Sequence, residues 1–212
     1  MGSSADEIVS LYERHAAAWT RARDASQFPE AEWMNRFGKF LARGSTVLDI
    51  GCGSGRPLAE HFIDLGFDVF GIDSSPTLIN TCRTRFPRQA WFVADMRTLS
   101  LGRRFQGLIA WDSFFHLSHA SQRAMFPIFE KHAAAGAVLI FNSGPRHGEA
   151  IGTFEGEPLY HGSLASAEYR DLLRTSGFDV LSHEVEDPNC GGRTVWLARA
   201  VRRDSPDGAG TA

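Results

Sequence analysis

The chain has 212 residues, of which 43% are apolar, a length and composition typical of one α/β domain. Lysine and arginine number 22 and aspartate and glutamate 25; this formal net charge of −3, without a basic run, argues against a nucleic-acid partner. With three scattered cysteines, no CxxC pair, no signal peptide and no apolar stretch of membrane-spanning length, we expect a cytoplasmic protein without a disulfide framework, metal site or membrane partner.

Two amphipathic helices are expected before the first strand. Residues 5–23 carry one apolar stripe at helical spacing, and residues 29–42 carry a second. Tyr12 and Trp19 lie on the first stripe, and the sequence leaves two roles open for them: a lid over a ligand, or packing in the core. We assign residues 1–43 to an N-terminal helical lid or cap.

From residue 44 onward, short apolar segments alternate with amphipathic ones. Strands are expected at residues 46–50, 68–72, 91–94, 105–111, 137–141, 178–186 and 193–201, and helices at residues 57–66, 75–86, 121–134 and 166–176. This alternation predicts a doubly wound, mostly parallel sheet in a single domain that ends at residue 201. Residues 143–165 show few helix or strand signals and are interpreted as a long functional loop, and the polar tail 202–212 is expected to be disordered.

The glycine-rich segment after the first strand is the most informative part of the sequence. Gly51, Gly53 and Gly55 allow the backbone to turn sharply and to approach a ligand where a Cβ atom would clash. A dinucleotide-binding GxGxxG motif would need glycine at position 56, where Arg56 stands instead. The spacing is therefore GxGxG, with Asp49 before it.

Two acidic residues end the next two strands. Asp73 can accept hydrogen bonds from both hydroxyls of a ribose, although a carboxylate here can also cap the helix that begins near residue 75. Asp95 can accept a hydrogen bond from an adenine amino group, and Met96 offers an apolar surface to the ring, although methionine also commonly packs in cores. Ligands of doubly wound sheets bind at the carboxyl ends of the strands, so these residues together indicate an adenosine site.

These segments resemble the class I S-adenosylmethionine-dependent methyltransferase family. The matching segments are residues 47–55, 71–75, 93–99 and 105–119. The resemblance implies a Rossmann-like, seven-stranded sheet with helices on both faces and a C-terminal antiparallel hairpin. It also implies that the glycine loop holds the methionine moiety of S-adenosylmethionine, Asp73 the ribose, and Asp95 with Met96 the adenine. The candidate cofactor-binding residues are Asp49, Gly51, Cys52, Gly53, Gly55, Asp73, Ser74, Asp95, Met96 and Trp111, within a cofactor-binding core at residues 44–142.

The acceptor side is expected beyond the fourth strand. His116 lies just past the end of that strand, at a place where many small-molecule methyltransferases of the family carry a histidine. It is either a general base near neutral pH or a structural residue that holds the loop. The segment 143–165 is expected to cover the acceptor, with candidate acceptor-binding residues Arg146, His147, Tyr160 and His161, and Arg146 would attract an acidic group. A solvated loop without such a role is the alternative.

The favoured function is methyl transfer from S-adenosylmethionine to an oxygen or nitrogen atom of a small-molecule acceptor, by in-line displacement. An Asp/Asn-Pro-Pro-Tyr motif, typical of DNA amino-methyltransferases, is absent: the corresponding segment begins at Trp111 and Asp112. Two alternatives stay open: a protein that binds S-adenosylmethionine without transferring its methyl group, and a nicotinamide-dependent oxidoreductase. The sequence specifies neither the acceptor nor the oligomeric state.

Overall fold

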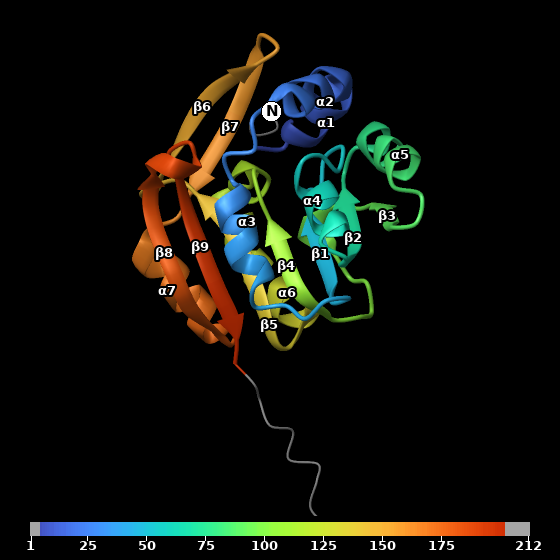
Figure 1. Ribbon diagram of the computed structural model, residues 1–212. Coiled ribbons are helices and arrows are strands. Elements are labelled where there is room, and N and C mark those ends of the chain that lie inside the picture. The colour runs from blue at the N-terminus through green and yellow to red at the C-terminus, as the bar shows by residue number, and fades with distance from the viewer. Residues whose placement is uncertain (1–4, 202–212) are drawn as a thin grey trace, which may run out of the picture.

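The computed structural model describes residues 5–201, so residues 1–4 and the predicted tail 202–212 lie outside the described part. The central sheet contains β1 (Thr46–Ile50), β2 (Asp68–Asp73), β3 (Ala90–Val93), β4 (Phe105–Ala110), β5 (Ala133–Ser143), β8 (Phe178–Asp187) and β9 (Arg193–Ala200). Its strand order is β3-β2-β1-β4-β5-β9-β8 (Figure 1). The first five strands are parallel, whereas β9 runs antiparallel to β5 and to β8. This confirms the doubly wound, mostly parallel sheet with a C-terminal antiparallel hairpin.

The order of the strands reverses at β1, which pairs with β2 on one side and with β4 on the other. The connections leave β1 and β4 in opposite directions, which opens a crevice at their carboxyl ends. The glycine-rich segment follows β1, and the segment that contains His116 follows β4. The topology therefore brings the two candidate halves of the site together.

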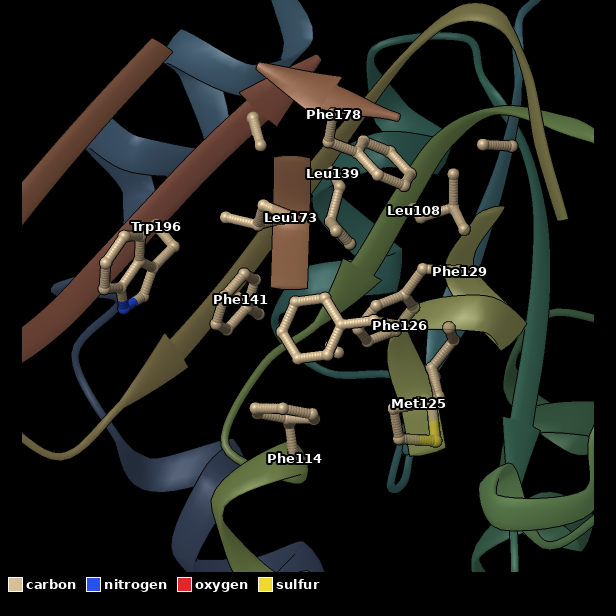
Figure 2. Packing of buried hydrophobic residues seen from close by; sticks show 14 of the residues in the cluster. Leu108, Phe114, Met125, Phe126, Phe129, Leu139, Phe141, Leu173, Phe178 and Trp196 are labelled. Carbon is tan, nitrogen blue, oxygen red and sulfur yellow. The ribbon is translucent and has the colours of Figure 1, made fainter. Parts of the chain in front are cut away.

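Helices cover both faces of the sheet. They are α3 (Ala31–Gly38), α4 (Leu58–Asp64), α5 (Pro76–Arg85), α6 (His119–His132) and α7 (Ser166–Thr175). Successive side chains of a strand point to opposite faces, and in β1 Val47 joins a core with α3 and α4, whereas Leu48 joins a core with α6 and α7. Figure 2 shows the second core, where Phe126 and Phe129 of α6 pack near Phe141 and Trp196 of the sheet.

The single helix expected at residues 5–23 is two helices in the structure. α1 (Ile8–Arg14) and α2 (Ala16–Ala25) are separated at His15, whose backbone leaves the helical region with φ −108° and ψ 19°. The apolar stripe continues across this break, which is why the sequence pattern did not reveal it. Tyr12 and Trp19 meet edge to face across the break, with ring centroids 5.2 Å apart. Both helices lie over the end of the sheet that carries the candidate site (Figure 1).

The prediction of a long loop at residues 143–165 is wrong. This segment forms an antiparallel hairpin of β6 (Gly148–Phe154) and β7 (Glu157–Ser163), which extends beside α1 and α2 (Figure 1). The two turn residues Glu155 and Gly156 have φ 50° and 82°, the left-handed geometry that two-residue hairpin loops favour. Tyr160 of β7 packs on α1 in a small apolar cluster. Glycine and charged residues in β6 obscure the alternation that normally reveals a strand. No helix within residues 5–201 is long and apolar enough to cross a membrane.

Candidate functional site

The glycine-rich loop is held so close to its neighbours that side chains are excluded from it. Gly51 has φ 80°, and a Cβ atom there would lie 2.4 Å from Cβ of Ser113. Gly53 has φ 55°, and a Cβ atom there would lie 2.9 Å from Nε1 of Trp19 on α2. Contacts this short are sterically forbidden, so both positions require glycine. The loop therefore presents bare backbone to the space beneath α1 and α2.

Asp73 supports this loop from the end of β2. Its Oδ2 accepts a hydrogen bond from the backbone N–H of Gly53 at 3.0 Å, and its Oδ1 accepts one from the N–H of Ser75 at 2.9 Å. Burial raises the pKa of Asp73, while these backbone N–H groups act against the rise. The helix cap proper is Ser75, whose Oγ accepts a hydrogen bond from Leu78. Asp73 thus connects the first and second strand ends.

Asp95 and Met96 follow β3 on the same rim. Asp95 pairs with the guanidinium of Arg97, with Oδ2 2.6 Å from Nη2, and this hydrogen bonding lowers the pKa of Asp95. The Asp95 side chain also accepts a hydrogen bond from the N–H of Arg97 at the start of the short helix η1 (Met96–Thr98). Cε of Met96 lies 3.3 Å from the position that a Cβ atom of Gly51 would take. The side chain of Met96 therefore lies next to the glycine loop.

These residues surround a first cavity of about 80 Å³ beneath α1 and α2. Six of the predicted cofactor-binding residues line it: Gly51, Gly53, Asp73, Ser74, Asp95 and Met96. Tyr12 and Trp19 also line it, which supports the lid interpretation of these two residues over packing in the core. Carboxylates at two strand ends, a side-chain-free backbone cradle and an apolar thioether match the hydroxyls, the polar chain and the ring of an adenosine-bearing group.

Four other predicted residues lie behind the loop and do not line this cavity. Cys52 and Trp111 are buried in the core on the side of α3 and α4. A Cβ atom on Gly55 would lie 2.9 Å from the ring of Phe86, so Gly55 faces α5. Asp49 is buried within β1, and burial together with the charge of Asp73 raises its pKa to about 7. These four residues lie on the side of the loop that faces away from the first cavity.

A second cavity, of about 830 Å³, lies between the end of β4, the β6–β7 hairpin and the start of β9. Arg146, His147 and His161 line it, as predicted. Tyr160 does not: its ring is buried against α1, and its hydroxyl donates a hydrogen bond to Oε1 of Glu149 at 2.8 Å. The alternation of side chains along β7 turns Tyr160 away when its neighbour His161 faces the cavity.

The two cavities share one wall. The four residues that line both are Tyr12, Trp19, Asp112 and His116. His116 is buried, with Nδ1 2.7 Å from the carbonyl oxygen of Tyr160 and Nε2 2.8 Å from the hydroxyl oxygen of Tyr12. A carbonyl can only accept, so Nδ1 carries the proton, and in the neutral ring Nε2 accepts from Tyr12. Burial lowers the pKa of His116 to about 4, so the neutral ring is the form present near pH 7.

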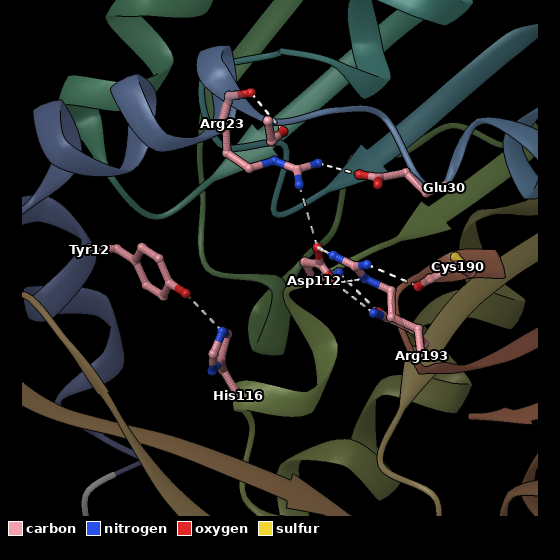
Figure 3. A network of polar contacts seen from close by, with 9 residues as sticks. Tyr12, Arg23, Glu30, Asp112, His116, Cys190 and Arg193 are labelled. Carbon is pink, nitrogen blue, oxygen red and sulfur yellow. Dashed lines mark hydrogen bonds and ion pairs between the residues drawn. The ribbon is translucent and has the colours of Figure 1, made fainter. Parts of the chain in front are cut away.

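Asp112, one of the four residues of the shared wall, is the centre of an ionic network (Figure 3). Asp112 forms a two-pronged pair with Arg193, at 2.9 Å to Nε and 2.8 Å to Nη2, and accepts a hydrogen bond from Asn142 at 2.7 Å. Nη1 of Arg23 on α2 lies 3.8 Å from Asp112, and Arg23 also pairs with the buried Glu30. The backbone of Asp112 is left-handed, with φ 46°. The network thus fixes an unfavourable backbone geometry at the cavity boundary and links it to α2.

Sequence reasoning missed Arg23, Arg193 and Phe115 as cavity-lining residues. Arg23 and Arg193 are 170 positions apart in the chain and carry no local motif, so only the fold brings them to one carboxylate. The signal that was available is Asp112 itself, an acidic residue at the end of a buried strand beside the strand-order reversal. Such a residue calls for a cationic partner, but sequence does not tell which arginine supplies it.

Comparisons with known proteins find similarity to methyltransferases. Residues 47–136 match the model of a methyltransferase domain. Over 98 residues the chain is 31% identical to dTDP-3-amino-3,4,6-trideoxy-alpha-D-glucopyranose N,N-dimethyltransferase of Streptomyces venezuelae, a match that covers 45% of this chain and 41% of that protein. Over 85 residues it is 35% identical to trans-aconitate 2-methyltransferase of Methylobacterium radiotolerans, covering 39% of this chain and 31% of that protein. The matched region thus spans less than half the length of these relatives.

A solved structure extends the similarity to nearly the whole fold. The 1,6-didemethyltoxoflavin-N1-methyltransferase of Burkholderia thailandensis, with bound 1,6-didemethyltoxoflavin and S-adenosylhomocysteine, has a TM-score of 0.72 to this chain. The alignment covers 95% of this chain and 92% of that one, at 17% identity, so it shows a common fold. Together with the matched domain and the glycine loop, it leads to one conclusion. Residues 47–136 are similar to a methyltransferase domain, and the chain shares its fold with a solved small-molecule methyltransferase.

Proposed function

We propose that this protein transfers the methyl group of S-adenosylmethionine to a nitrogen or oxygen atom of a small molecule held in the second cavity. One observation carries the proposal: the first cavity, at the glycine loop, and the second cavity share the wall formed by Tyr12, Trp19, Asp112 and His116. Methyl transfer needs the donor carbon and the acceptor atom in line and in contact. Two adjoining cavities with a common wall suit that requirement.

The first cavity is the proposed cofactor site. Gly51 and Gly53 would contact the methionine part, Asp73 the ribose hydroxyls, and Asp95 with Met96 the adenine. When bound, the cofactor supplies an electrophilic methyl group on a positively charged sulfur. Tyr12 of α1 and Trp19 of α2 line this cavity. Residues 5–43 are in this view a lid.

The second cavity is the proposed acceptor site. Its volume of about 830 Å³ is within the usual range for a small organic molecule. Phe115 and His161 both line it, with their ring centroids 5.1 Å apart. Arg146 is exposed at the cavity and is the proposed contact for an acidic group of the acceptor. In related proteins, the acceptors named include an amino sugar nucleotide and trans-aconitate.

Calorimetry tests the cofactor half of the proposal. S-adenosylmethionine and S-adenosylhomocysteine are titrated into the wild type and into Asp73→Asn, with Asp68→Asn as the matched control at the opposite, exposed end of β2. We expect binding by the wild type and by the control, and a loss of at least tenfold in Asp73→Asn, because the amide offers one acceptor oxygen where the carboxylate offers two, and its NH2 group can only donate. Thermal melting establishes that each variant is folded. No heat of binding in the wild type would contradict the proposal.

A further inference from the structure

The imidazole and the carboxylate in the wall between the two cavities, those of His116 and Asp112, have every ring nitrogen and carboxylate oxygen engaged in a hydrogen bond. Both ring nitrogens of His116 are engaged, Nδ1 as donor to the Tyr160 carbonyl and Nε2 as acceptor from Tyr12. A general base must lie within hydrogen-bond reach of the proton that it removes, with its lone pair directed there. The lone pair of His116 is directed at the Tyr12 hydroxyl instead.

The other residues of the wall do not replace His116. Both oxygens of Asp112 are bonded, Oδ1 to Arg193 and Asn142 and Oδ2 to Arg193. The indole of Trp19 is a donor only. His147, Glu149 and His161 line the second cavity alone, and His161 is stacked on the ring of His116, with centroids 5.0 Å apart. None of these three lines the first cavity, where the methyl donor is proposed to bind.

A relay through Tyr12 would end on the same imidazole. The Tyr12 hydroxyl could pass its proton to Nε2 only by creating a buried imidazolium beside His161, and burial together with His161 lowers the pKa of His116. Burial and the nearby charges of Asp112 and Asp73 raise the pKa of Tyr12, so its phenolate is also disfavoured. The hydrogen bond therefore suits a structural link better than a path for protons.

From this arrangement we infer that the reacting atom of the acceptor already carries a proton-free lone pair at neutral pH, as a neutral amine, a ring nitrogen or a carboxylate does, and that unactivated hydroxyl groups are not methylated. This inference rests on the proposed function and names its acceptor class. The lone pair of the acceptor forms the new bond to the methyl carbon while the carbon–sulfur bond breaks, and the electron pair of that bond stays on sulfur. An amine product then loses its proton to water through the open second cavity, and a carboxylate has none to lose.

Matched acceptors test the inference directly. The panel contains aniline, benzoate, phenol, benzyl alcohol and pyridine. Each compound is incubated with protein and S-adenosylmethionine, and methylated products are measured by mass spectrometry. We expect the amine, pyridine or carboxylate members to react and the hydroxyl members to react about 10²–10⁴-fold more slowly, the usual contribution of a missing general base. Comparable methylation of a hydroxyl member would overturn the inference. Comparison of the reaction with aniline and the reaction with benzoate shows whether the acceptor atom is a nitrogen or a carboxylate oxygen.

A second measurement decides the matter if no compound in the panel fits the cavity. Nitrogen-15 NMR of the imidazole, assigned with His116→Gln, reports the protonation of each ring nitrogen in the protein without any ligand. We expect a protonated Nδ1, an unprotonated Nε2 and no titration between pH 5 and 8. Tyr12→Phe should shift the Nε2 resonance, whereas Tyr160→Phe, which keeps the carbonyl, should not. A ring that titrates near pH 6.5 would overturn the inference, while absence of cofactor binding in calorimetry would overturn the proposed function alone.

Discussion

The hydroxyl of Tyr12 and Nε2 of His116, 104 positions apart in the chain, lie 2.8 Å apart and join the N-terminal helices to the end of β4. Tyr12 also meets the ring of His116 edge to face, with centroids 5.4 Å apart. The pair forms part of the wall between the two cavities, so it couples the position of α1 to the geometry of both cavities.

Removal of the Tyr12 hydroxyl should destabilise the protein. In Tyr12→Phe, the buried Nε2 of His116 loses its donor, and an unsatisfied buried polar atom costs about 1–3 kcal/mol. Urea unfolding at pH 7 measures the change. Tyr160→Phe is the control, because its hydroxyl contacts only the exposed Glu149 and its loss should cost less. Equal losses in the two variants would show that the Tyr12–His116 contact does not stabilise the lid.

Gly51→Ala should abolish cofactor binding. The new Cβ atom would collide with Ser113 at 2.4 Å, in addition to the cost of a left-handed backbone, about 1–2 kcal/mol. Gly102→Ala separates these effects, because Gly102 has φ 65° and no atom within 4 Å of its Cβ position. We expect the control to lose some stability and keep its affinity for S-adenosylhomocysteine in calorimetry. Retained affinity in Gly51→Ala would mean that the loop is not the cofactor cradle.

Asp49 should make the folded state less stable as the pH rises. Burial raises its pKa to about 7, whereas an unfolded aspartate titrates near a pKa of about 3.9. A raised pKa contributes stability that is full below the unfolded value and is lost as the pH rises through the folded one. Asp49→Asn should therefore gain stability relative to the wild type between about pH 4 and pH 7, and keep that gain at pH 8. Urea unfolding across this range checks it, and a pH-independent difference would refute it.

The pair of Asp112 and Arg193 should show strong coupling in a double-mutant cycle. Either single variant, Asp112→Asn or Arg193→Gln, leaves a partly buried charge without its partner, at a cost of about 3–5 kcal/mol in well-buried pairs. The double variant removes both charges and should recover part of the loss. Unfolding free energies of the four proteins give the coupling. Additive losses would show that the two residues act independently.

The central sheet could be predicted because each buried strand has its own short apolar signature and its own glycine or acidic residue at the end. β1 with Gly51 and β2 with Asp73 are examples: strand type, order along the chain and ligand-facing end follow from local sequence. The hairpin at residues 148–163 was missed because it is stabilised by its Glu155–Gly156 turn and by packing of Tyr160 on α1. The sequence pattern does not contain that tertiary contact.

Only some residues of the candidate site could be predicted from the sequence. Residues at a strand end or within a few positions after it, such as Asp73, Met96 and His116, line the first cavity, and their position in the sequence pointed to that end of the sheet. Residues whose role depends on which way a side chain turns were not: Cys52 and Trp111 point into the core, and Tyr160 faces α1 instead of the cavity. Side-chain direction within a loop or an unrecognised strand is fixed by packing, which periodicity does not report.

A crystal structure of the protein with S-adenosylhomocysteine tests the central claim most directly. We expect the nucleoside in the first cavity, with its ribose hydroxyls on Asp73, its adenine beside Asp95 and Met96, and its sulfur directed at the wall of Tyr12 and His116. A nucleoside bound elsewhere, or carboxylates of Asp73 and Asp95 turned away from it, would contradict the account.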